Sequence, residues 1–97
     1  MQPRLASSVL VSALLRRVES QGGFGAVLAK GDSTAGAIAV ILTQRAESPR
    51  FFERQLEPDG SYGWRESPQT FENDQDLKKF LEKKRRIDPD LWIIELD

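Results

Sequence analysis

Apolar residues recur at intervals of three and four in two segments of the chain, a spacing that places them on one side of a helix. In the first segment this apolar side consists of Leu10, Val11, Leu14, Leu15 and Val18. Ser7 or Ser8 is expected to cap this helix, and Gly22 to end it. The second segment begins at Asn73 or Asp74 and ends before a proline. Each segment therefore predicts one amphipathic helix.

The remaining apolar segments are shorter and either alternate with polar residues or run continuously, as strands do. They lie at residues 24–30, 37–45, 50–57, 61–66 and 91–96. The run from Ala37 to Leu42 is apolar at every position, which is typical of a strand covered on both faces. The predicted order of elements is therefore α-β-β-β-β-α-β.

The tripeptide Pro-Asp-Gly at residues 58–60 is the strongest local turn signal in the chain. Proline presets the first dihedral angle of a turn, and glycine accepts the positive φ that follows. The turn predicts a hairpin in which Glu57 pairs with Ser61, so that Arg54 faces Trp64. One face of the hairpin then carries Phe52, Arg54, Leu56, Tyr62 and Trp64, and the other carries Glu53, Gln55, Glu57, Ser61 and Arg65.

These elements predict one α+β domain over residues 1–97, a length that fits a single domain. Short connections favour an antiparallel meander of the first four strands, with residues 31–36 as the hairpin loop between the first two. We expect the last strand at an edge of the sheet, beside the first strand. Two helices then pack on the sheet.

Composition excludes several classes of chemistry. The 97 residues include no histidine and no cysteine, which removes imidazole proton relays, disulfides, thiolate nucleophiles and sulfur-based zinc sites. We expect no cofactor, no metal site and no catalytic residue. Fourteen basic and 15 acidic residues give a net charge of −1, whereas dedicated nucleic-acid domains carry a clear basic excess.

The apolar stretch at residues 5–15 is about half of the ~20 residues that span a bilayer, so no membrane segment is expected.

Several short motifs occur in a fixed order along the chain. They are Pro3-Arg4-Leu5, Arg16-Arg17, Gly22-Gly23-Phe24, Gly31-Asp32-Ser33-Thr34-Ala35-Gly36, Pro58-Asp59-Gly60, the run from Lys83 to Trp92, and Glu95-Leu96. As an ordered set they resemble a family of small alphaproteobacterial proteins, the domain of unknown function 1491. The resemblance covers nearly the whole chain and implies a bacterial, single-domain, cytoplasmic protein. It implies no activity, cofactor or site residue.

The glycine-rich segment at residues 31–36 has two interpretations. Gly31-Asp32-Ser33 is similar to the nucleophile segment of some serine proteases, but the chain has no histidine to activate Ser33. The first interpretation is therefore turn geometry. The alternative is a small anion bound by backbone N–H groups at Gly31, Asp32, Ser33 and Thr34. Phosphate-binding glycine loops usually precede a helix, whereas this one precedes a strand.

The second helix carries six cations. Lys84 lies on the apolar side, where its stem is expected to pack along the core. The others form a basic patch of Lys78, Lys79, Lys83, Arg85 and Arg86. This patch is either a solvated helix face or an electrostatic surface for RNA, anionic lipid or an acidic protein.

Aromatic side chains surround an arginine on the predicted hairpin. Arg54 is expected to stack on Trp64, which it faces. If the first helix covers this face, the group forms an edge of the core. If the face is open, Arg54, Tyr62 and Trp64 form an interaction surface, because these residue types are enriched at binding hot spots.

These observations predict a non-catalytic protein that binds an unknown protein partner or a second copy of itself. The contact would use either the surface around Arg54 or the basic patch. One alternative is an RNA or polyanion binder that uses the basic patch, although nucleic acid is not favoured by the net charge. The other is a small-molecule or anion binder at the loop between Gly31 and Gly36.

Overall fold

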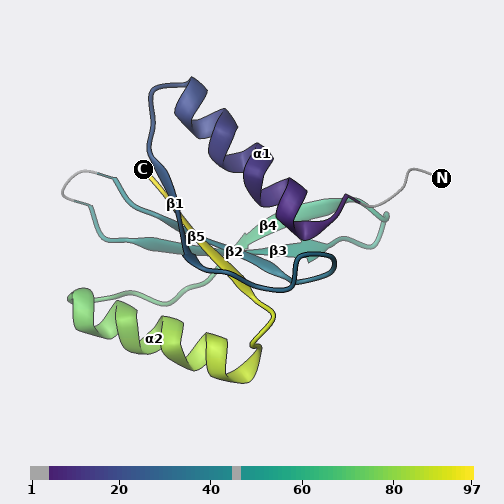
Figure 1. Cartoon of the computed structure of the whole chain (residues 1–97). Helices are drawn as coiled ribbons and strands as arrows, with labels where there is room; N and C mark the ends of the chain where they lie inside the picture. The colour runs from purple at the N-terminus through teal and green to yellow at the C-terminus, as the bar shows by residue number, and fades with distance from the viewer. Residues whose placement is uncertain (1–4, 45–46) are drawn as a thin grey trace.

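The computed structural model describes residues 5–44 and 47–97 and contains two helices and five strands in the predicted order (Figure 1). The elements are α1 (Ser7–Ser20), β1 (Gly25–Ala29), β2 (Ile38–Leu42), β3 (Arg50–Leu56), β4 (Tyr62–Glu66), α2 (Asp74–Ile87) and β5 (Trp92–Leu96). The strand predicted over residues 37–45 ends at Leu42, and Arg45 lies outside the described residues.

The two helices cover opposite faces of one five-stranded mixed sheet, which confirms the predicted α+β class (Figure 1). Under α1, the buried cluster consists of Val11, Ile38, Val40, Trp92 and Ile94. On the α2 side it consists of Ala39, Ile41, Phe51, Phe71, Leu91 and Ile93, against which Leu77, Phe80 and Leu81 pack. Alternate residues of β2 and β5 thus supply both cores, as the continuous apolar run of β2 predicted.

The order of the strands in the sheet is β1-β5-β2-β3-β4. The predicted meander is therefore confirmed for β2, β3 and β4, but the expected pairing of β1 with β2 is wrong. β5 lies between them, antiparallel to β1 and parallel to β2. It neighbours β1 as expected but is not an edge strand. Because Trp92, Ile93 and Ile94 are all buried, this strand has apolar side chains for both faces, and only an interior position covers both.

Residues 31–36 are consequently not a hairpin loop. Three hydrogen bonds tie residues 32–37 to the start of β5 instead. The backbone N–H of Asp32 donates to the Asp90 carbonyl at 3.0 Å, and that of Trp92 donates to the Ala37 carbonyl at 2.8 Å. The indole Nε1 of Trp92 donates to the Asp32 carbonyl at 2.7 Å. These contacts join residues far apart in the chain, so the length of the loop did not reveal them.

The β3–β4 hairpin has the predicted register. Leu56 pairs with Tyr62 and Arg54 with Trp64, and Gly60 has the expected positive φ of 88°. The Glu57 N–H donates to the Ser61 carbonyl at 2.7 Å and closes the loop.

The N-terminal cap predicted from the sequence is found at α2 but not at α1. Asn73 caps α2, because its side chain accepts a hydrogen bond from the Asp76 N–H at 2.9 Å. The expected serine cap of α1 is wrong, because the capping position is Ala6. The buried Ser7 hydroxyl instead donates to the Gly36 carbonyl at 2.6 Å and joins α1 to the segment before β2.

Candidate functional site

The aromatic face of the β3–β4 hairpin is open. Trp64 is 43% exposed and Tyr62 is 39% exposed, and Leu56 on the same face is also exposed. Helix α1 packs over β2 and β5, and Phe52 of β3 packs against the same cluster, but the part of the hairpin face that carries Tyr62 and Trp64 stays accessible. Arg54, Tyr62 and Trp64, here called the Arg54 surface, are therefore not an edge of the core.

Arg54 is held in place by an aromatic ring, although not the expected one. Its guanidinium carbon lies 3.7 Å from the centre of the Tyr62 ring. Trp64 is directly opposite Arg54 in the register, whereas Tyr62 is its diagonal neighbour. A long side chain reaches the diagonal position across a strand pair, and the cation gains from the electron-rich face of the ring. The arginine is thus oriented along the strands, toward the hairpin turn.

A groove of about 990 Å³ adjoins this surface. The start of α1, residues 34–38, Arg54 and residues 60–62 line it. Leu10 and Ile38 give it apolar walls, and Arg54 is the charged side chain among the lining residues. Within the described ranges, no acceptor binds the Arg54 guanidinium by a hydrogen bond or ion pair. Sequence reasoning missed the groove because three segments distant along the chain form it.

The geometry of the loop at residues 31–36 accounts for its glycines and for Asp32. The Asp32 carboxylate accepts hydrogen bonds from the N–H groups of Thr34 at 3.2 Å and Ala35 at 2.8 Å. A side chain on Gly31 or Gly36 would overlap the backbone of Asp90. Two of the four N–H groups of the predicted anion loop, those of Asp32 and Thr34, are therefore already bound within the chain.

The six cations of α2 fall into two groups. The Lys84 ammonium lies 2.8 Å from a carboxylate oxygen of Glu53 and near the ring of Phe51, so its stem packs along the core as expected. Arg85 donates to the backbone carbonyls of Pro89 and Leu91. The remaining four are exposed and form no ion pair within the part of the chain that the structure describes: Lys78, Lys79, Lys83 and Arg86. Arg85 therefore has a structural contact that the sequence did not reveal.

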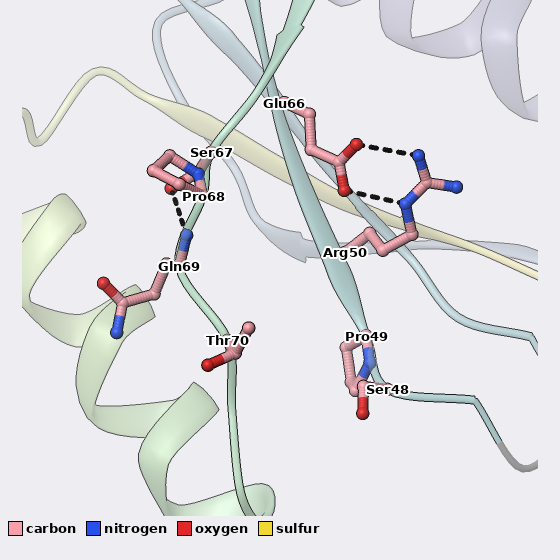
Figure 2. Close-up of a pocket in the computed structure, with 8 residues that line it drawn as sticks. All are labelled: Ser48, Pro49, Arg50, Glu66, Ser67, Pro68, Gln69 and Thr70. Carbon is pink, nitrogen blue, oxygen red and sulfur yellow. Dashed lines mark hydrogen bonds and ion pairs between the residues drawn. The ribbon is translucent and has the colours of Figure 1, made fainter.

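A smaller hollow of about 320 Å³ lies between residues 48–50 and 66–70 (Figure 2). Two bonds of 2.7 Å join the Arg50 guanidinium to the Glu66 carboxylate beside it. This hydrogen-bonded pairing raises the pKa of Arg50 and lowers the pKa of Glu66. The two charges satisfy one another, so this hollow offers a ligand no unpaired charge among its lining residues.

Residues 5–44 and 47–97 contain neither a metal-binding cluster nor a membrane-spanning helix. No cluster of three or more side chains suited to metal binding occurs there. Neither α1 nor α2 is long and apolar enough to cross a membrane. The fold and the surface thus define a small α+β protein with an open aromatic surface beside a groove.

The chain belongs to the DUF1491 family, whose model is described as a protein of unknown function and matches residues 5–97. This confirms the resemblance noted in the sequence. No curated protein matches the chain.

Three solved structures are similar to this chain. A crystal structure of a DUF1491 family protein from Caulobacter crescentus is 35% identical, with a TM-score of 0.84, and the match covers 96% of this chain and 87% of that one. An NMR structure of a DUF1491 family protein from the same species is 37% identical, with a TM-score of 0.80 and coverages of 98% and 86%. A solution structure of an Agrobacterium tumefaciens protein is 32% identical, with a TM-score of 0.75 and coverages of 97% and 86%.

Proposed function

We propose that this protein is a non-catalytic interaction module that binds a protein partner through the Arg54 surface and the adjoining groove. The observation that carries the proposal is the exposure of Tyr62 and Trp64 around a stacked arginine. Tryptophan, tyrosine and arginine are the residue types most enriched at binding hot spots. A contiguous exposed patch of this kind commonly marks a site where another molecule binds.

The chemistry of the groove indicates which contacts a partner makes. Its walls are largely apolar, and Arg54 supplies a cation without a bound carboxylate among the described residues. An apolar side chain next to an aspartate or glutamate suits both features, because guanidinium binds carboxylate through two parallel hydrogen bonds. The stack on Tyr62 orients the guanidinium before binding, which lowers the entropic cost of the contact.

A pull-down tests this proposal. The tagged chain is exposed to a native lysate, with and without nuclease, beside its Arg54→Ala and Trp64→Ala variants. We expect both variants to lose the protein captured by the parent chain while they keep its circular dichroism spectrum. Ile87→Ala is the matched control, because Ile87 is a 73% exposed apolar residue at the end of α2. Unchanged capture by both variants contradicts the proposal.

The outer side of α2 supports a second candidate function, the binding of a polyanion such as RNA. Lys79, Lys83 and Arg86 are exposed and lie four and three residues apart, a spacing that aligns them on one side of the helix. Binding through these cations must weaken steeply as salt rises, because counterions are released from the polyanion. We expect a triple change of these residues to glutamate to abolish binding of a labelled RNA. Binding that is insensitive to salt contradicts this candidate.

A further inference from the structure

We propose that the partner at the Arg54 surface is a second copy of this chain, joined edge to edge through β4. The two β4 strands would run antiparallel across a two-fold axis at Trp64 and make one continuous ten-stranded sheet. This inference rests on the proposed function and specifies its partner.

The two edges of the sheet differ in their suitability for strand pairing. β1 is irregular, because its register with β5 shifts between Val27 and Ala29 and leaves Leu28 without a partner residue. Such bulges protect an edge against the addition of another strand. β4 pairs with β3 in an unbroken register over all five of its residues, from Tyr62 to Glu66. β4 is therefore the edge at which the sheet can be extended.

The hydrogen bonds of the hairpin show which backbone groups of β4 point outward. Ser61 accepts a bond from the Glu57 N–H, and the Ser67 N–H donates to the Phe51 carbonyl. Successive residues of a strand direct their backbone groups to opposite sides. Odd-numbered residues of β4 therefore bond to β3, and the N–H and C=O groups of Trp64 and Glu66 point away from the sheet. They are placed to bond a further strand.

The side chains of β4 are complementary to the same strand run in reverse. When Trp64 faces Trp64 across the two-fold axis, Tyr62 faces Glu66 and Gly63 faces Arg65. All five residues are paired and no like charges meet. In the register that moves the axis to Arg65, two arginines face each other, which destabilises a strand pair. The Trp64-centred register also brings the two exposed indoles together, where stacked aromatic pairs are favourable.

A cysteine placed at the axis tests this register, because the chain has no cysteine of its own. Directly facing residues in a hydrogen-bonded antiparallel pair have Cα atoms about 5.5 Å apart, which is within the range that a disulfide bridges. We expect Trp64→Cys to form a covalent dimer under mild oxidation. Ile87→Cys is the control, since Ile87 is more exposed than Trp64 and lies at the end of α2 rather than on β4, so this variant should remain largely monomeric. Equal cross-linking of the two variants overturns the proposal.

A charge swap at the same position provides an independent test by sedimentation. The parent chain is expected at twice the 10.9 kDa monomer mass. Trp64→Lys and Trp64→Glu place two like charges at the axis, so each variant alone should be monomeric. An equal mixture of the two should restore the dimer, because lysine then faces glutamate. A parent chain that is monomeric at every concentration, or single variants that dimerise as the parent does, overturns self-pairing.

Failure of this inference differs from failure of the proposed function. A monomeric parent chain that still captures another protein in an Arg54-dependent manner overturns the self-pairing alone. A monomeric parent chain whose capture of proteins does not depend on Arg54 or Trp64 overturns both.

Discussion

Two adjacent arginines at the end of α2 offer a matched pair for measuring which cations stabilise the fold. The Arg85 guanidinium donates to the carbonyl oxygens of Pro89 and Leu91, and so joins the last turn of α2 to the start of β5. Arg86 is exposed and makes no side-chain hydrogen bond or ion pair within the described residues. Replacement of each by alanine removes the same atoms from very different surroundings.

The expected difference follows from the two hydrogen bonds. A hydrogen bond from a charged group contributes roughly 1.5–3 kcal/mol when it is buried, and Arg85 is only half-buried. We therefore expect Arg85→Ala to lower the free energy of unfolding by about 1–3 kcal/mol. Arg86→Ala should change it by less than about 0.5 kcal/mol, as is usual at the surface. In a domain of this size 1 kcal/mol corresponds to about 4–8 °C in Tm, so the two variants should be clearly separated.

Urea and thermal unfolding, followed by far-ultraviolet circular dichroism, measure this difference. Arg85→Lys is an informative third variant, because lysine keeps the positive charge but its side chain is shorter, so its ammonium does not reach the position of Nη1, the nitrogen that donates both bonds. It should fall between the parent chain and Arg85→Ala. If Arg85→Ala is no less stable than Arg86→Ala, then Arg85 belongs to the solvated basic face and the structural role assigned to it is wrong.

Three further changes should have measurable effects. Phe51 is fully buried and meets the Phe80 ring edge-on, with centroids 5.0 Å apart. Phe51→Ala should therefore cost about 3–5 kcal/mol in urea unfolding, whereas Phe24→Ala, at a site 58% exposed, should cost less than about 1 kcal/mol. Gly36→Ala should cost about 1–3 kcal/mol, since the added carbon would overlap backbone atoms of Asp32 and Asp90; a neutral effect in the same assay contradicts this packing. The pKa of Glu66 is lowered in the folded chain, chiefly by its hydrogen bond from Arg50. The ionised Glu66 side chain therefore stabilises the folded chain above its ordinary pKa of 4.5, and this contribution is lost as the pH falls through the lowered pKa. Glu66→Gln should flatten that part of the acid unfolding profile, and an unchanged profile contradicts the pairing.

Features that depend on neighbouring residues could be predicted from the sequence. The hairpin register followed from Pro58 and Gly60, because a turn of three residues leaves one pairing of the strands that follow it. The Asn73 cap and the apolar side of α2 also depend only on residues close together in the chain, so the sequence could predict them. The aromatic residues of the Arg54 surface could be predicted together, because the same register brings them to one face.

Features that depend on distant residues could not be predicted in this way. The position of β5 in the sheet depends on which strands can bury apolar side chains on both faces. The lengths of the connecting loops do not report this property. The Arg54 guanidinium stacks on the diagonal ring of Tyr62 and not on the facing ring of Trp64. This contact depends on the length and rotamer of the arginine side chain, which the strand register does not specify. The groove required α1, residues 34–38 and the hairpin turn to converge, and only their packing brings them together.

The second chain is proposed to bind at the β4 edge. The exchange rates of the β4 amide hydrogens, measured at increasing protein concentration, test this proposal most directly. In dilute solution the N–H groups of Gly63 and Arg65 should be protected by their bonds to β3, while those of Trp64 and Glu66 should exchange rapidly. As the concentration rises, the Trp64 and Glu66 amides should become protected together. Rapid exchange of the Trp64 amide at every concentration would contradict the assignment of β4 as the site where a second chain binds.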